Sequence, residues 1–317
     1  MGSSNSSTLT VSVIIPTRNE EKVISECLTA VFNQSFSPSE VIVVDGRSTD
    51  NTIKVATGYP VKVLVESEPT SLPNARNIGV ENAQSDILFI MDADVILDKD
   101  CIMNAVKYFE DTQIIGVIPV EDNKAHSRLE RIQIDYFRGS ANPIRTGIGI
   151  SVFAEFLRKS VFQRLKFDPR LGYGEDGDFQ RRLLNSYAHS GKVTRSPKSI
   201  ISVHYSHTLK ELRSQYSWYG RTFKGYLSKN LLLKPILNLG SLLAPTLMII
   251  SGLITIIFPL LLPLFVLIAV LVVARNLLVC VRSRRPTFFE FLAFEFLRSL
   301  FFIRGLLQGL LSKKRGR

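Results

Sequence analysis

The sequence predicts a doubly wound α/β domain with a mostly parallel sheet, followed by a membrane-associated C-terminal region. From Val11 to about residue 205, short apolar runs alternate with helical stretches, which is the pattern of strands and covering helices. From Ile236 to Val281 the chain is apolar apart from Arg275. As a helix, these 46 residues would extend about 69 Å, enough to cross a bilayer core of about 30 Å twice. We therefore expect a protein that is not purely soluble.

Charge is distributed unevenly along the 317 residues. Residues 206–317 hold 16 basic and 3 acidic side chains, whereas residues 1–205 hold 23 basic and 25 acidic ones. The net charge of +11 thus comes from the last third of the chain, and nucleic acid is not an expected partner of the α/β domain. A mean hydropathy of +0.15 excludes a disordered chain. The three cysteines are too widely separated for a disulfide framework or a CxxC metal site, which suits a reducing compartment.

Five runs of about five β-favouring residues are expected to form strands. They are apolar on both faces, as in a parallel sheet that helices cover on both sides. The runs are Val11–Ile15, Val41–Val44, Val61–Val65, Ile87–Met91 and Ile114–Pro119. The residues before them, 1–9, are polar, lack the pattern of a signal peptide and are expected to be a disordered tail.

Helix signals separate these strands. Asn19 is expected to cap the first helix and Asp50 the second, because short polar side chains accept hydrogen bonds from the first helical N–H groups. Pro73 is expected in the first turn of the third helix. Further elements are expected at Cys101–Phe109 (helix), Asp176–Tyr187 (helix) and Ser199–Val203 (strand). In such a sheet, ligands bind beyond the carboxyl ends of the strands.

Polar clusters follow three of the predicted strands directly. They are Pro16–Glu20, Asp45–Thr52 and Asp92–Asp94. Strand-to-helix turns favour such residues in any case, so each cluster alone is weak evidence for a site. The carboxyl ends of neighbouring parallel strands lie at one edge of the sheet, so the three clusters together predict one crevice.

Asp92 and Asp94 have the spacing of a cation site. Two residues apart in an extended chain, their carboxylates point to the same side and repel each other unless a cation lies between them. Hard oxygen ligands select Mg²⁺ or Mn²⁺, and a metal with few protein ligands fills its shell with phosphate oxygens. The pair therefore predicts a metal–diphosphate site. The alternative is that these acids only cap the helix that follows, a role for which Asp98 is better placed.

The ordered motifs IIPTRNEE, VIVVDGRSTDNT, ARNIG, FIMDADV and GYGEDGDFQRRL resemble those of family-2 glycosyltransferases with the GT-A fold. The resemblance covers about three fifths of the chain, from Val11 to His204. It implies an inverting enzyme that uses a UDP- or GDP-linked sugar and a divalent cation. One departure is that many relatives have two adjacent acids where this chain has Asp45-Gly46, which leaves the nucleobase open.

The resemblance also implies residue roles. The metal would be held by Asp94 and Asp92, with His204 as a further candidate, although a surface or core histidine is the commoner outcome for such a residue. The residues implied in donor binding are Pro16, Thr17, Arg18, Glu20, Asp45, Arg76, Asp92 and Glu175.

Asp176 is the expected catalytic base. Inverting transfer needs a base that takes the proton of the acceptor hydroxyl on the face of the sugar opposite the leaving diphosphate. The Gly174-Glu175-Asp176 cluster, distant in sequence from Asp94, supplies such a carboxylate, and Asp178 is its rival. The alternative is that these acids only favour the positive end of the helix dipole.

Basic and aromatic residues alternate between Thr208 and Lys234, which is typical of an interfacial helix on anionic headgroups. The same mixture can bind single-stranded nucleic acid, but the adjoining apolar run favours a membrane. Gln215–Trp218 resembles the QxxRW motif of processive synthases and suggests Trp218 on the acceptor side. The arginine before the tryptophan is absent, so we expect transfer of a single sugar.

The run 236–281 is expected to form a two-helix transmembrane hairpin that turns near Phe258–Pro263. Basic residues flank both ends, so the positive-inside rule places both ends and the α/β domain in the cytoplasm. Phe288–Leu311 is apolar but carries four charges, which favours a helix in the membrane plane over a third crossing. The expected organisation is a tail (1–9), a GT-A domain (10–205), an interfacial helix region (206–235), the hairpin (236–281) and a basic amphipathic tail region (282–317).

The sequence thus predicts a metal-dependent glycosyltransferase of the cell membrane that acts on a lipid-linked saccharide or glycolipid. An alternative acceptor is polyprenyl or dolichyl phosphate itself, which is already anionic and needs no base. A further alternative is a non-catalytic membrane scaffold, although both carboxylate motifs are present.

Overall fold

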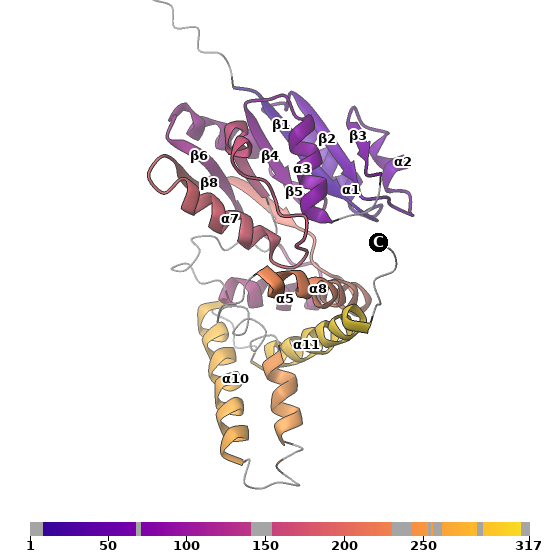
Figure 1. Ribbon diagram of the computed structural model, residues 1–317, viewed down its shortest axis with the longest axis vertical. Helices are drawn as coiled ribbons and strands as arrows, with labels where there is room; N and C mark the ends of the chain where they lie inside the picture. Colours follow the sequence, from indigo (N-terminus) through magenta and orange to yellow (C-terminus); the bar gives the residue numbers. More distant parts are fainter. Residues whose placement is uncertain are drawn as a thin grey trace, which may run out of the picture. The chain divides into compact units, whose positions relative to one another are not determined.

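The computed structural model describes residues 9–67, 71–140, 154–229, 243–252, 255, 262–283 and 288–311 (Figure 1). The chain forms two compact units. The first unit comprises residues 1–123, 150–170 and 174–204, and the second comprises residues 124–149, 171–173 and 205–317. Each unit is considered by itself.

The first unit is built on an eight-stranded mixed sheet with the order β3-β2-β1-β4-β7-β6-β8-β5 among the described residues. Neighbouring strands from β3 to β4 are parallel, whereas β7 runs antiparallel to both β4 and β6. The strands are β1 (Val11–Thr17), β2 (Glu40–Asp45), β3 (Lys62–Val65), β4 (Ile87–Met91), β5 (Val95–Leu97), β6 (Ile114–Glu121), β7 (Ala154–Arg158) and β8 (Lys192–Val203).

Helices cover both faces of this sheet, as its apolar strands require. The buried side chains of α1 (Ile24–Phe32) and α4 (Cys101–Val106) pack with one set of strand residues. Those of α3 (Leu72–Asn82) and α7 (Glu175–Ser186) pack with the other set, together with the 3-10 turn η2 (Lys159–Gln163). All residues of β1 and β4 are buried. The predicted doubly wound α/β domain is confirmed.

Most predicted elements of this unit are confirmed within one or two residues, including all five apolar strands. The N-cap position of α2 (Thr52–Ala56) is occupied by Asn51 and not by the predicted Asp50, although the Asp50 side chain accepts the N–H of Thr52 at 3.0 Å. Pro73 lies in the first turn of α3, where Ser71 is the N-cap. The helix predicted at Cys101–Phe109 is α4 continued by the 3-10 turn η1 (Lys107–Glu110).

The prediction that Asn19 caps the first helix is wrong. The helix α1 begins at Ile24 and its N-cap position is occupied by Val23. Asn19 has a φ of 59°, and its side-chain oxygen accepts the N–H of Thr49 at 2.8 Å. The Asn19 side chain, which the sequence pattern assigned to the start of α1, therefore bonds to the loop after β2 instead.

The second unit is helical in its described part. Its long helices are α5 (Arg128–Ser140), α8 (Leu209–Lys229), α10 (Leu262–Ser283) and α11 (Phe288–Leu311). The helices α8 and α11 pack with their backbones close together, because a Cβ atom on Gly305 would lie only 1.9 Å from the Ser217 carbonyl oxygen. An additional helix, α5, was not predicted from the sequence.

Two of the four charges of α11 are buried within this unit. Glu295 Oε1 lies 2.9 Å from Arg275 Nη2 and accepts the Tyr136 hydroxyl at 2.5 Å, and Glu295 Oε2 accepts the Asn276 side-chain amide at 2.8 Å. Arg298 lies with its guanidinium over the Tyr136 ring. The helix therefore satisfies these charges inside the protein, while Phe289, Leu307 and Leu311 are exposed.

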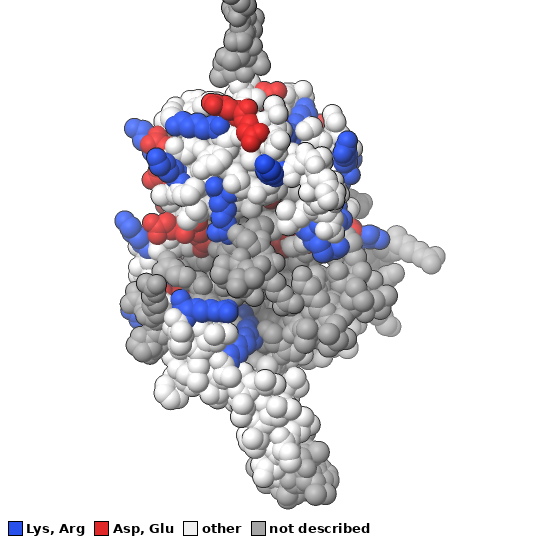
Figure 2. Space-filling view, turned by 90° about the vertical axis from the view of Figure 1, so that its left-hand side faces the viewer, with Lys and Arg blue, Asp and Glu red and all other residues white. Residues whose placement is uncertain are grey.

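One helix among the described residues, α10, is long and apolar enough to cross a membrane. A shorter apolar helix spans Leu243–Gly252. Much of the first half of the predicted hairpin lies outside the described residues, so the two-helix hairpin is not confirmed. Of its expected turn at Phe258–Pro263, the first four residues are outside the described part, and Leu262 and Pro263 begin α10. On the face shown in Figure 2, the described residues at the lower end of this unit show no charged side chain, and the charges of α10 are Arg275 and Arg282 in its second half.

Candidate active site

The first three strands end in one row at the edge of the sheet. In the strand register, Asp45 pairs with Thr17 on one side and with Val65 on the other. The Gly46 N–H then donates to the Thr17 carbonyl at 2.8 Å, and the Glu66 N–H donates to the Asp45 carbonyl at 3.0 Å. Polar residues at this edge therefore also come from the end of β3, which was not among the three strand ends predicted from the sequence.

The loops after β1 and β2 hold each other in place. The carboxylate of Asp45 is fully buried and accepts the Ser48 N–H at 2.8 Å and the Ser48 hydroxyl at 2.5 Å. The Asn19 N–H donates to the same hydroxyl at 2.8 Å, and the Glu20 N–H donates to Thr52 Oγ1 at 2.8 Å. Two segments about 30 residues apart thus form one ordered wall, which includes Pro16 and Thr17 and presents Arg18 to solvent.

Arg76 joins the two acidic motifs. This arginine of α3 is 1% exposed, and its Nη2 atom lies 2.7 Å from Asp92 Oδ1 while its Nη1 atom lies 2.6 Å from Glu175 Oε1. Its guanidinium also lies over the Phe167 ring, 5.4 Å from the centroid. Because a guanidinium presents a rigid fork of donors, it fixes both carboxylates at once. The Asp92–Asp94 motif and the Gly174–Asp176 motif, 83 residues apart from Asp92 to Glu175, therefore meet in space.

Several acidic side chains of the site lie close together and are largely buried. Burial and the neighbouring charge of Asp92 raise the pKa of Glu20 to about 7. Burial, the charge of Asp176 and that of Asp92 raise the pKa of Glu175 to about 7, which Arg76 partly opposes. The pKa of Asp94 lies well above its usual range, because of burial and then the charges of Asp92 and Glu20. A bound cation would relieve this repulsion.

Asp94 fits the role of a metal ligand. Its Oδ1 atom is buried and has no hydrogen-bond partner among the described residues. Among the residues that the structure describes, no group of three or more His, Cys, Asp or Glu side chains has the arrangement of a metal site.

The backbone of His204 is hydrogen-bonded to the Asp92–Asp94 motif. Its N–H donates to the Asp94 carbonyl oxygen at 2.9 Å, while its ring Nε2 lies 3.0 Å from Glu26 Oε2. The side chain is thus engaged with α1, and its role as a metal ligand stays a prediction.

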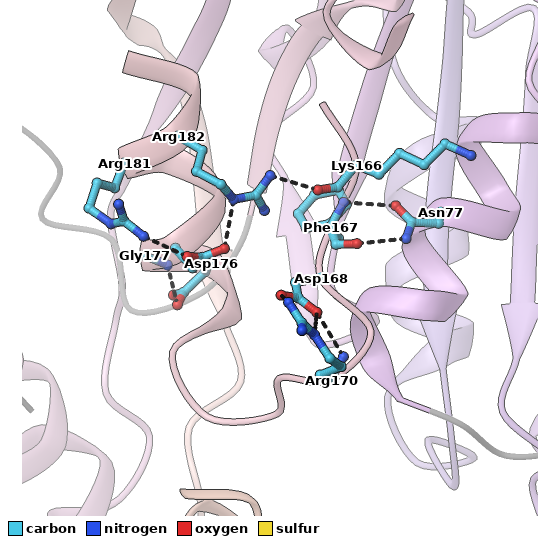
Figure 3. A network of polar contacts seen from close by, with 10 residues as sticks. Asn77, Lys166, Phe167, Asp168, Arg170, Asp176, Gly177, Arg181 and Arg182 are labelled. Atoms are coloured by element: carbon cyan, nitrogen blue, oxygen red, sulfur yellow. Dashed lines mark hydrogen bonds and ion pairs between the residues drawn. The ribbon is translucent and has the colours of Figure 1, made fainter. Parts of the chain in front are cut away.

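Two of the acids that begin α7 differ sharply in their surroundings. Asp178 is buried, and its two carboxylate oxygens each lie 2.8 Å from a guanidinium nitrogen, one of Arg181 and one of Arg182. Asp176 is exposed and accepts the Gly177 N–H at 2.6 Å (Figure 3). Of these two carboxylates, only that of Asp176 is exposed to solvent.

The segment before α7 is fixed to both neighbouring helices. Asn77 of α3 exchanges two hydrogen bonds with the Phe167 backbone, each 2.9 Å long. Arg182 donates to the Lys166 carbonyl oxygen at 2.9 Å, as Figure 3 shows. These contacts tie α3, which carries Arg76, to α7, which carries Glu175 and Asp176.

Trp218 belongs to the second unit, on α8, where its ring lies 5.5 Å from that of Tyr219. Its expected place on the acceptor side stays a prediction.

Two residues at the site were missed from the sequence. Cys27 is fully buried and its thiol has a raised pKa, because of burial and the charges of Asp94 and Asp92. Glu66 follows β3 directly, so the strand-end rule that selected the other acids could have found it.

The chain matches the family model described as Glycosyl transferase family 2 over residues 12–165. It is 26% identical to the dolichyl N-acetyl-alpha-D-glucosaminyl phosphate 3-beta-D-2,3-diacetamido-2,3-dideoxy-beta-D-glucuronosyltransferase of Methanococcus voltae, over 94% of this chain and 98% of that protein. It is 30% identical to the O-antigen chain rhamnosyltransferase RfbN of Salmonella typhimurium, over 65% of this chain and 70% of that protein.

Among solved structures, the mannosyltransferase PcManGT from Pyrobaculum calidifontis, in complex with GDP-Man and Mn²⁺, resembles this chain with a TM-score of 0.56 at 19% identity. The alignment covers 98% of this chain and 89% of that one. This likeness supports the GT-A fold of the mixed sheet. Together with the sequence relatives, it establishes that the chain is a glycosyltransferase and belongs to glycosyl transferase family 2.

Proposed function

We propose that the protein is a metal-dependent, inverting glycosyltransferase that moves one sugar from a nucleotide-sugar donor to a hydroxyl of a membrane-associated acceptor. The observation that carries the proposal is the pairing of Arg76 with both Asp92 and Glu175. This pairing supports a single site, because Asp92 belongs to the motif expected to hold the diphosphate and Glu175 adjoins the expected base.

The donor would lie along the wall formed by the loops after β1 and β2. Its nucleoside would contact Pro16, Thr17 and Arg18 and the floor formed by Asp45. Asp92 and Asp94 would hold Mg²⁺ or Mn²⁺, which would neutralise charge on the leaving diphosphate. Glu20 and Glu175 would line the same site, and Arg76 would keep Asp92 in its orientation.

Asp176 would act as the general base. It is exposed, whereas Asp178 is buried and ion-paired with Arg181 and Arg182. If Asp178 accepted a proton, the positive charges of these two arginines would lose their partner. The Asp176 carboxylate would accept the proton of the acceptor hydroxyl as the oxygen attacks the anomeric carbon. The bond from that carbon to the diphosphate oxygen then breaks, and the configuration inverts.

The acceptor would be a lipid-linked saccharide or glycolipid. The apolar helix α10 exposes Leu267, Val270 and Leu271, which suits contact with lipid. The helix α11 also exposes apolar side chains, among them Leu300 and Leu307. The name of the Methanococcus voltae relative specifies a dolichyl-linked sugar phosphate as acceptor. Basic residues at Lys229 and Arg282 support a cytoplasmic position for the first unit at a cell membrane that the chain crosses more than once.

The test is transfer by the full-length protein in nanodiscs. Radiolabelled UDP- and GDP-linked sugars are supplied one at a time with total lipid extract and Mn²⁺ or Mg²⁺. We expect label from one donor class to enter the organic phase, and EDTA to abolish this. Transfer that is insensitive to EDTA would contradict metal dependence. Label that appears only as free sugar with every donor would contradict a lipid acceptor.

A further inference from the structure

The ring of Phe167 contacts both helices that carry the buried charges of the site. Phe167 is 1% exposed and belongs to the segment between η2 and α7. The guanidinium of Arg76, on α3, lies over this ring at 5.4 Å from its centroid. The same ring stacks on Phe179 of α7, with the two centroids 4.1 Å apart. Phe179 follows Glu175 by four residues, which is about one helical turn.

The backbone of Phe167 is fixed by the residue that follows Arg76 on α3. Asn77 is buried, its side-chain amide donates to the Phe167 carbonyl oxygen, and its side-chain oxygen accepts the Phe167 N–H, each at 2.9 Å (Figure 3). Two adjacent residues of α3 therefore bind the same residue, one through its backbone and the other through its ring. This arrangement fixes the place of the ring relative to the guanidinium.

The ring restricts the plane of the guanidinium, and that plane sets the positions of two carboxylates. Arg76 binds Asp92 through Nη2 at 2.7 Å and Glu175 through Nη1 at 2.6 Å. The face of an aromatic ring attracts a guanidinium that lies over it, whereas an aliphatic side chain only fills the space. A tilt of the guanidinium would move the two carboxylates relative to each other. A displacement of about 1 Å in a site can lower a reaction rate about a hundredfold.

We infer that Phe167 is a positioning residue for sugar transfer, which acts through Arg76. Its ring orients the guanidinium and thereby sets the position of Asp92 relative to Glu175, the neighbour of Asp176. The inference rests on the proposed function, which assigns the diphosphate site to the motif of Asp92 and the base to Asp176. Phe167 is buried, so its effect reaches the reaction through the arginine and the two carboxylates.

The experiment compares Phe167→Leu with the matched control Phe162→Leu. Phe162 is 8% exposed and belongs to the same apolar cluster. Its ring lies 6.2 Å from that of Phe167 and 5.8 Å from that of Phe179, and within the described part of the chain it stacks on these two rings alone. Each substitution removes one buried ring of this cluster, so both should lower the melting temperature by similar amounts.

The kinetic readout separates positioning from packing. Full-length variants in nanodiscs are assayed with total lipid extract, saturating Mn²⁺ and the UDP- or GDP-linked sugar that the wild-type protein transfers. Phe167→Leu should lower kcat at least about tenfold, because the carboxylates are displaced. The KM for the donor should change less than about threefold, because no group that binds the donor is removed. Phe162→Leu should keep both constants within about twofold of the wild-type values.

Each other outcome has a definite meaning. Equal losses of kcat in the two variants would show that Phe167 only packs the core, which overturns this inference and leaves the glycosyltransferase function intact. A rise in donor KM as large as the fall in kcat would also overturn it, because the ring would then act in donor binding. A wild-type protein that transfers no sugar from any donor overturns the proposed function, on which the inference rests. If Phe167→Leu does not fold, Phe167→Met carries the same prediction, since a methionine side chain adapts to irregular space.

Discussion

At the scale of single residues, Arg76 has the largest influence on the site. A buried arginine is stable only if its charge is paired, and here two carboxylates from different parts of the chain provide the partners. Removing the guanidinium would leave Asp92 and Glu175 as neighbouring acids in a buried place. The positions of both motifs therefore depend on one side chain.

Arg76→Met is expected to lower the free energy of unfolding by about 3–5 kcal/mol, because it leaves buried charge uncompensated. The measurement is urea denaturation of the first unit followed by circular dichroism in the full-length protein. Lys166→Met is the control, since Lys166 pairs with Glu81 at the surface, 64% exposed, and its loss should cost less than about 1 kcal/mol. Equal effects of the two substitutions would show that the Arg76 pairing does not stabilise the fold.

The sequence predicted candidate acids but not how they are connected. Asp92 and Asp94 were predicted from their spacing and strand-end position, and Asp176 from the family resemblance and its acidic cluster. The pairing of Arg76 with Glu175 joins residues 99 positions apart, and no local pattern encodes such a contact. Glu66 was missed although it follows its strand directly, because the sequence analysis considered only the polar clusters after three other strands.

At the scale of elements, the apolar strands were predictable and the others were not. The strand β7 contains Glu155 and Arg158, which break its apolar pattern, and β5 has only three residues. Only the last five of the twelve residues of β8 were predicted, since Pro197 and a register shift against β6 interrupt the strand. These strands form because neighbours from distant parts of the chain complete their hydrogen bonding, which a local pattern does not reveal.

The helix α3 lies unusually close to the sheet at Gly79. A Cβ atom there would lie 2.3 Å from Ile14 Cγ2, so Gly79→Ala must displace the helix or the strand. We expect a loss of about 1–3 kcal/mol in the free energy of unfolding. In the control Gly177→Ala, the new Cβ would meet no atom within 4 Å, and helix propensity predicts a gain of up to about 1 kcal/mol. Thermal melts of the two variants should therefore shift in opposite directions, and a shared direction would contradict this packing.

At the scale of the whole molecule, buried acids make stability depend on pH. Glu155 of β7 is 1% exposed, and burial raises its pKa from 4.5 to about 8, while the Gln180 side chain opposes part of this rise. The folded state therefore binds a proton that the unfolded state releases between these two values, so this residue lowers stability as pH rises from about 4.5 to about 8.

Glu155→Gln is expected to remove that part of the pH dependence. The variant should gain stability over the wild-type protein as pH rises, by up to about 1.4 kcal/mol per pH unit between 5 and 8. Because Glu20 and Glu175 also have pKa values raised to about 7, the difference between variant and wild type at each pH is the quantity to measure. A difference that does not change with pH would show that Glu155 titrates normally.

The membrane region can be tested on α10. Val270 is 56% exposed in the middle of the helix, and Val281 is 75% exposed near its end beside Arg282. Val270→Arg would place a charge near the centre of a bilayer at a cost of about 2.5–3.5 kcal/mol, whereas Val281→Arg would place it near the headgroups. After extraction of membranes with carbonate, we expect less of the Val270→Arg variant to remain in the membrane than of the wild-type protein, and no such loss for Val281→Arg. Equal fractions for both variants would argue against a crossing by α10.

The central claim is that acids from distant parts of the chain surround one donor site, with Asp176 left to deprotonate the acceptor. Sugar transfer and donor binding by Asp176→Asn, measured on the same preparation, test it most directly. Transfer should fall by at least about a hundredfold, because the base is lost, while the donor dissociation constant should change by less than about twofold. Retained transfer, or a loss of donor binding as large as the loss of transfer, would contradict the claim.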